Sequence, residues 1–101
     1  MTKQETLASL TELEKIVIIN MFAEGFATDN PDDRFMSWGV DGKKERGALA
    51  SLVKKGVVTV EDWGADKPVF LTKDYTKRDV LSATKELASG FVKRFAEEIG
   101  A

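Results

Sequence analysis

The chain contains no cysteine and no histidine, and it has only two prolines among its 101 residues. The missing cysteine excludes disulfides, thiolate nucleophiles and zinc sites built from cysteine and histidine. The missing histidine removes the side chain that most often acts as a general base near neutral pH. No phosphate-binding loop or dinucleotide fingerprint is present either. We therefore expect no catalytic residues, no metal site and no cofactor, and we do not expect an enzyme.

Long apolar runs are also missing. The longest, residues 16–19, is far shorter than the roughly 20 residues of a membrane span. Residues 1–5 lack the apolar core of a secretion signal. These features predict a cytoplasmic protein with no membrane partner. The 43% of apolar residues is enough for a real core, which predicts one domain over residues 1–101.

The net charge of −2 is small, but it is unevenly distributed. Residues 1–42 carry three basic and eight acidic groups, whereas residues 43–60 carry five basic groups and one acidic group. Salt screens charges beyond roughly 8–10 Å. A phosphate beside residues 43–60 would therefore feel the local positive charge more than the distant acidic N-terminus.

Three helices are expected in the first half of the chain. The first begins at Ser9 or Thr11, each of which is followed three residues later by a glutamate, and runs to about Glu24. Asn30-Pro31 and the two aspartates after them predict a short helix over about 31–38.

A third helix is predicted from about residue 42 to Lys55, with Gly56 as its end. A turn of about three residues that contains a glycine joins it to the short helix, which is the connection expected of a helix-turn-helix at about 31–55.

The second half predicts a hairpin and a long helix. Two segments rich in β-branched and apolar residues, on either side of a turn, indicate a β-hairpin at about 57–72. Trp63, near its tip, is expected either to pack on a sugar or a partner or to close the hairpin over the core, and Trp38 is expected in the core. Apolar residues on one side predict a helix over about 77–99.

The sequence RGALASLVKKGVV at 46–58 resembles the Leu-x-x-Leu-x-x-x-Gly-hydrophobic-Val signature of MarR-type regulators. Residues 70–72, Phe-Leu-Thr, resemble the second wing strand of those proteins. With the order of elements, most of the chain resembles the winged helix-turn-helix superfamily. This resemblance implies a mainly helical α+β fold: a three-helix core, a β-hairpin wing and a long C-terminal helix.

The sequence departs from MarR-type regulators in two places. Those proteins usually carry helices before the DNA-binding part, whereas only a few residues precede the first helix here. Their wing often bears an arginine near the tip, whereas this wing has Asp62, Asp66 and a single Lys67.

In this superfamily the helix at about 42–55 would enter the major groove. A helical projection centred on Leu49 as the buried side leaves a basic and otherwise small outer face. Lysines on such a face are often simply solvated, and the position of this cluster on the helix used for DNA favours binding. The predicted DNA-binding residues are Lys43, Lys44, Arg46, Gly47, Ser51, Lys54, Lys55 and, from the wing, Lys67.

The leading hypothesis is a sequence-specific double-stranded DNA-binding protein, a small transcriptional regulator that reads the major groove with the helix at about 42–55. The helix at about 77–99 either folds back on the first helix or pairs with its copy in a homodimer, and we favour the homodimer because two half-sites give a small domain a useful footprint on DNA. The alternative is a winged-helix protein–protein interaction module, a complex subunit or small inhibitor that does not bind DNA. The acidic net charge and the wing without arginine favour that alternative.

Overall fold

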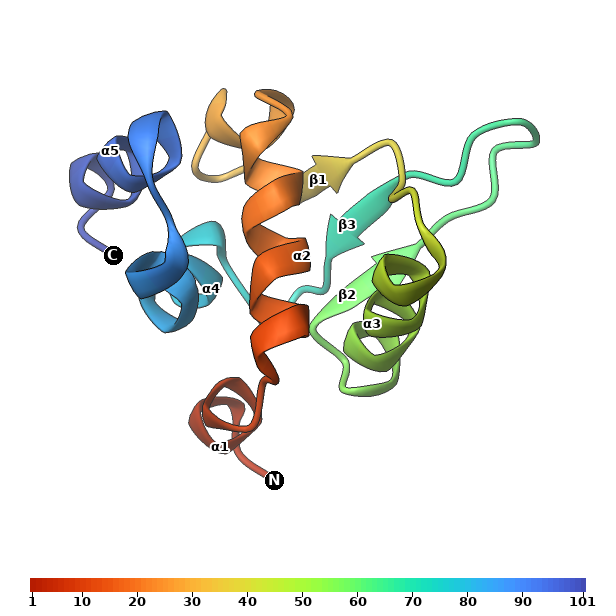
Figure 1. Cartoon of the computed structure of the whole chain (residues 1–101), viewed down its shortest axis with the longest axis horizontal. Helices are drawn as coiled ribbons and strands as arrows, with labels where there is room; N and C mark the ends of the chain where they lie inside the picture. The colour runs from red at the N-terminus through yellow and green to blue at the C-terminus, as the bar shows by residue number, and fades with distance from the viewer.

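The computed structural model describes residues 1–101, which form a mainly helical α+β fold. Five α-helices and three short strands make up the chain (Figure 1). The α-helices are α1 (Lys3–Ala8), α2 (Glu12–Ala23), α3 (Lys43–Lys54), α4 (Lys77–Thr84) and α5 (Gly90–Glu98). Two short 3₁₀ turns, η1 (Phe26–Thr28) and η2 (Lys85–Leu87), accompany the strands β1 (Phe35–Ser37), β2 (Val58–Val60) and β3 (Val69–Leu71).

Helix α2 is the central element of the fold. It begins as predicted at Thr11, whose side chain accepts from the Glu14 amide while the Glu14 carboxylate accepts from the Thr11 amide. Figure 1 shows α4 and α5 on one side of α2, and the sheet and α3 on the other. This explains why its apolar residues spread around more than one side of the helix.

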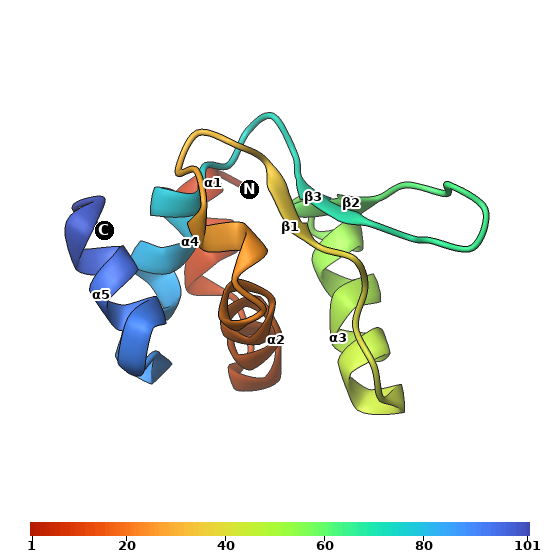
Figure 2. The same ribbon diagram turned by 90° about the horizontal axis from the view of Figure 1, so that it is seen from above.

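The predicted hairpin is confirmed, with strands shorter than expected. β2 and β3 pair antiparallel with Val58 opposite Leu71 and Val60 opposite Val69. β1 pairs antiparallel with the other edge of β3, so the strand order is β1-β3-β2. The hairpin loop then extends past the helices (Figure 2).

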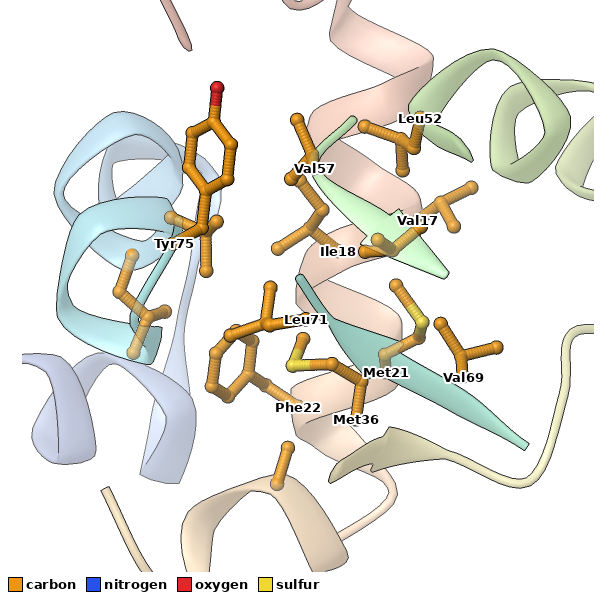
Figure 3. Packing of buried hydrophobic residues seen from close by; sticks show 14 of the residues in the cluster. Val17, Ile18, Met21, Phe22, Met36, Leu52, Val57, Val69, Leu71 and Tyr75 are labelled. Atoms are coloured by element: carbon orange, nitrogen blue, oxygen red, sulfur yellow. The ribbon is translucent and has the colours of Figure 1, made fainter. Parts of the chain in front are cut away.

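The buried apolar side chains form one continuous cluster. Figure 3 shows residues from α2, α3 and the strands meeting between the central helix and the sheet. Phe22, Met36 and Val69 within it are all fully buried. On the other side of α2, the Phe95 ring lies 6.1 Å from that of Phe22 and ties α5 to the same core. None of the helices has both the length and the apolar character needed to cross a membrane.

The predicted short helix over 31–38 is wrong: this segment forms a turn and then β1. The Asn30 side chain accepts from the Asp32 amide at 2.9 Å, and the Asp33 carboxylate accepts from the Phe35 amide at 3.1 Å. These local hydrogen bonds compete with a helix and favour a turn. The predicted helix-turn-helix over 31–55 is therefore formed only in its second helix, α3.

The predicted single helix over 77–99 is also wrong, because the chain breaks between α4 and α5. Ala88 is extended, with φ −84° and ψ 153°, and Gly90 has φ +58°. The break lets α5 fold back, so that Val92, Phe95 and Ala96 are buried. The apolar stripe that suggested a dimer is thus largely covered within the chain, and the homodimer stays a prediction. Helix α1, which the sequence reasoning missed, has its own capping box between Thr2 and Glu5.

Candidate nucleic-acid interface

Helix α3 carries most of the predicted DNA-binding residues, and its ends are set by glycines. Gly42 precedes it with φ +93°, and Gly56 follows it with φ +77°, both in the region that favours glycine. A Cβ atom at Gly42 would lie only 2.8 Å from the carboxyl carbon of Glu45. The first turn of α3 is thus covered by its own carboxylate, so an anion would be held by side chains rather than by the helix N-terminus.

The inner face of α3 packs on α2 and β2. Ala48 and Leu52 are its buried residues, and Leu49 is only half-buried. The buried side is therefore rotated from the predicted centre at Leu49. The rotation brings Ser51 and Lys55 toward the core, and both are half-buried rather than part of the outer face.

The outer face of α3 is a short row with a cation at each end. Lys43, Gly47, Ala50 and Lys54 lie along it at helical spacing, and all four are exposed. The exposed cations Lys44 and Arg46 flank this row. We call these six residues the basic face.

The cations of the basic face have no ionic partner within the protein. The chain's three salt bridges join Lys3 to Asp79, Lys55 to Glu14 and Lys67 to Asp62. The basic face therefore presents four uncompensated positive charges, with no side chain larger than a methyl group between Lys43 and Lys54 along the row.

Lys55 does not lie on the basic face and is engaged within the protein. Its Nζ lies 2.7 Å from Glu14 Oε1 and donates to the Ser9 carbonyl at 3.2 Å. Glu14 is only 2% exposed, and its Oε2 has no hydrogen-bond partner. Burial alone would raise the pKa of this carboxyl, but the hydrogen bonds from Lys55 and the Thr11 amide outweigh it and lower the pKa below its ordinary value. Lys55 thus neutralises a buried charge that joins α3 to α2.

Lys67 lies in the hairpin loop, where its charge is compensated. Its Nζ lies 2.5 Å from Asp62 Oδ1 and also donates to the Gly64 carbonyl at 3.1 Å. The hydrogen bonds from Lys67 and from the Gly64 amide hold the pKa of the Asp62 carboxyl below its ordinary value. With Glu61 and Asp66 in the same loop, the tip is net acidic and repels phosphate.

Comparisons with known protein families, curated proteins and solved structures find no match for this chain. The assignment of a role therefore rests on the geometry of the chain's own side chains.

The chemistry of the basic face is suited to binding anions. Lysine and arginine hold phosphate oxygens by charge-assisted hydrogen bonds, and the planar arginine fork can also pair with two acceptors at once. No group of three or more histidine, cysteine, aspartate or glutamate side chains is arranged to hold a metal ion.

Of the eight predicted residues, Lys43, Lys44, Arg46, Gly47 and Lys54 lie together on the basic face, while Ser51, Lys55 and Lys67 do not. Sequence reasoning missed Ala50, which lies in the middle of the row. Its spacing of three residues from Gly47 and four from Lys54 is the signal that would have found it.

Proposed function

We propose that this protein binds double-stranded DNA by laying the basic face of α3 against the duplex. The observation that carries the proposal is the set of four exposed cations of α3, two on its outer row and one on each flank, that have no acidic partner in a salt bridge. In a protein of net charge −2, such a local concentration of positive charge favours an anionic partner over a cationic or neutral one.

The shape of the basic face supports a groove-binding role. Lys43 and Lys54 lie about 16 Å apart along the helix axis, at about 1.5 Å per residue. The small Gly47 and Ala50 between them allow the helix backbone to approach another molecule closely. The major groove of B-DNA is wide enough to admit an α-helix. In this arrangement the lysines contact phosphates and Arg46 reaches a guanine edge, which gives the protein a sequence preference.

The fold we infer is a winged-helix variant that lacks the first helix of its helix-turn-helix. The order α3, β2, hairpin loop, β3, α4 agrees with the predicted one. The short helix that would precede α3 is replaced by β1, and the wing tip is acidic. DNA contact is therefore confined to α3, and the protein acts as a small transcriptional regulator with a limited footprint.

Fluorescence anisotropy with a labelled mixed-sequence duplex of about 20 base pairs at about 50 mM salt tests the proposal. The double variant Lys44→Ala, Arg46→Ala should bind about tenfold more weakly, because two phosphate or base contacts are lost. The matched control is Lys93→Ala, Arg94→Ala, which removes the same two residue types from exposed positions on α5. Equal losses in both variants, or no binding of the native chain at low salt, would reject the proposal.

A further inference from the structure

Five of the nine aromatic residues lie in one connected cluster away from the basic face. We call it the aromatic face, and its members are Phe26, Phe35, Trp38, Trp63 and Phe70. The ring centroids of neighbouring members lie 5.0 to 6.0 Å apart. Most of these pairs meet edge to face, the arrangement that aromatic rings favour.

The strand register explains why these rings come together. Phe35 of β1 lies opposite Phe70 of β3, and side chains alternate between the two faces of a strand. Met36 and Val69 are fully buried toward the core, so the two phenylalanines lie on the other face of the sheet. Figure 2 shows α2 and α3 together on one side of the sheet. The aromatic face is thus formed on the side that these helices leave uncovered.

The aromatic face remains substantially open to solvent. Trp38 is 45% exposed, Trp63 is 53% exposed and Phe26 is 49% exposed. The prediction that Trp38 lies in the core is therefore wrong, because the segment that carries it leaves the core after β1. The contacts among the rings steady the hairpin, yet about half of three large side chains is left unburied. Exposed aromatic patches of this kind are typical of binding surfaces.

The charge around the aromatic face is strongly negative. The two segments that carry most of its rings, residues 24–41 and 61–67, contain eight carboxylates and only two cations, one of which is Lys67, paired with Asp62. The Trp63 indole N–H donates to the Glu61 carboxylate at 3.1 Å. A hollow beside Trp38 is lined by Glu24 and Asp41, and its one cation, Lys67, is already paired with Asp62.

Two of these carboxylates have a second neighbour. Asp29 and Asp33 also lie near the ammonium of Lys77, which is buried and donates to the Asn30 carbonyl at 2.8 Å. Burial lowers the pKa of Lys77, and these two carboxylates oppose that effect. Glu24 and Asp41, which line the hollow beside Trp38, and Glu61, which accepts from Trp63, have no cation in a salt bridge.

From this combination we infer that the aromatic face binds an extended, arginine-rich segment of a partner protein. Guanidinium groups stack on tryptophan rings and also pair with carboxylates, so one side chain satisfies both features of the surface. Single-stranded nucleic acid also stacks on aromatic rings, but its phosphates would be repelled here. The inference does not depend on DNA binding, because the rings lie on η1, at β1 and on the hairpin, and of the carboxylates it uses only Asp41 lies beside the start of α3.

Intrinsic fluorescence provides a site-specific test, because the only two tryptophans of the chain both lie in the aromatic face. A short peptide of alternating arginine and serine should change the tryptophan emission in a saturable way. The same peptide with glutamate in place of arginine, and an oligothymidine, should not. Substituting lysine for arginine should weaken binding severalfold, because the ammonium stacks less well on a ring.

Variants then locate the binding site by anisotropy of the labelled arginine peptide. Trp63→Ala should weaken binding about tenfold, the loss expected for a desolvated cation–π contact. Its control is Phe91→Ala on α5, which removes a ring that is 45% exposed. Glu61→Gln with Asp41→Asn should weaken binding while leaving the rings in place, and the matched pair Glu97→Gln with Glu98→Gln should not. The double variant with Glu61→Gln thus tests the inference even if Trp63→Ala unfolds the hairpin.

Several results would overturn the inference. One is an emission that does not respond to the arginine peptide. Another is an equal response to oligothymidine, which would make the face a nucleic-acid stacking surface. A third is an emission change on raising the concentration of the protein alone, accompanied by sedimentation as a dimer, which would mean that a second copy covers the rings. None of these results alters the expected effect of Lys44→Ala, Arg46→Ala on duplex DNA.

Discussion

Lys54 and Lys55 follow one another in the sequence, but they have different surroundings. Lys54 is exposed on the basic face and has no ionic partner. The Lys55 side chain is 26% exposed and neutralises the buried Glu14. Breaking a buried ion pair leaves the remaining charge in a medium that solvates it poorly, whereas an exposed lysine adds little to stability. Substitution of Lys55 should therefore affect stability, whereas substitution of Lys54 should affect DNA binding.

Lys55→Met should lower the free energy of unfolding by about 3 kcal/mol, because it leaves the Glu14 carboxylate buried without its partner. Lys54→Met should change it by no more than about 0.5 kcal/mol. Urea denaturation followed by circular dichroism measures both values. The effects on DNA affinity should be the opposite. Lys54→Met should bind DNA more weakly than the native chain, whereas the folded Lys55→Met variant should bind it with the native affinity. A stable Lys55→Met variant that has lost DNA affinity would contradict this assignment.

The same ion pair makes stability depend on pH. In the folded protein the pKa of the Glu14 carboxyl lies below its ordinary value of 4.5. As the pH falls, the Glu14 carboxylate is therefore protonated in the unfolded chain before it is protonated in the folded one. The stability contributed by Glu14 is therefore complete well above pH 4.5 and is lost as the pH falls through the folded pKa. Glu14→Gln should be less stable near neutral pH by about 2 kcal/mol.

The stability gap between Glu14→Gln and the native chain should narrow as the medium is acidified. Other carboxyls with a lowered pKa, such as Asp79, titrate in both proteins and cancel in the difference. The midpoints of urea denaturation, measured for both proteins at a series of pH values from neutral to acid, report this difference in stability. If the gap were independent of pH, the carboxylate of Glu14 would not be the stabilising species.

The role of Lys55 could not be predicted from local sequence. A helical projection centred on Leu49 placed it on the outer face, whereas the buried side of α3 is formed by Ala48 and Leu52. The decisive partner, Glu14, is 41 residues away. Its burial follows from the packing of α2 against α3 and not from its own sequence neighbours.

Among the helices and strands, the sequence correctly predicted the elements that carry strong local signals. The capping box at Thr11 set the start of α2, and the β-branched residues after Gly56 set β2. The prediction was wrong where two local signals compete. Asn30 is a good helix cap, yet here its side chain closes a turn, and pairing of Phe35 with Phe70 favours a strand instead. The aromatic face depends on that strand and could not be predicted without it.

Substitution by alanine should have opposite effects on stability at two glycines that lie in helices. Gly47 lies inside α3, and a Cβ there would meet no atom within 4 Å. Gly47→Ala should raise the free energy of unfolding by about 1 kcal/mol, through helix propensity. Gly90 begins α5 with φ +58°, where an alanine is disfavoured by about 1 kcal/mol or more. Gly90→Ala should therefore lower stability.

Thermal or urea denaturation of the two variants under identical conditions compares them directly. Gly47→Ala should also weaken duplex binding severalfold if the backbone of α3 approaches the DNA closely. A stabilising effect of Gly90→Ala would mean that α4 and α5 can join into the single helix that the sequence predicted.

The whole molecule presents two surfaces of opposite character. The basic face of α3 attracts phosphate, and the aromatic face, with its carboxylates, attracts cations. The molecule is only 35 Å in its longest dimension, a few times the roughly 8 Å over which physiological salt screens charge. The cations of the basic face lie on α3, whereas the rings of the aromatic face lie on η1, at β1 and on the hairpin. Because the two faces use different elements, we expect DNA and an arginine-rich segment to bind at the same time.

The salt dependence of DNA binding measures how many cations of the basic face contact phosphate. Each neutralised phosphate adds about −0.9 to the slope of log K against log salt concentration. Three phosphate contacts, from Lys43, Lys44 and Lys54, predict a slope of about −3, because Arg46 reaches a base edge instead. In Lys44→Ala, Arg46→Ala the slope should fall to about −2, whereas Lys93→Ala, Arg94→Ala should keep the native value. A native slope near zero would mean that phosphate is not the group recognised. An unchanged slope in Lys44→Ala, Arg46→Ala would place the phosphate contacts outside α3.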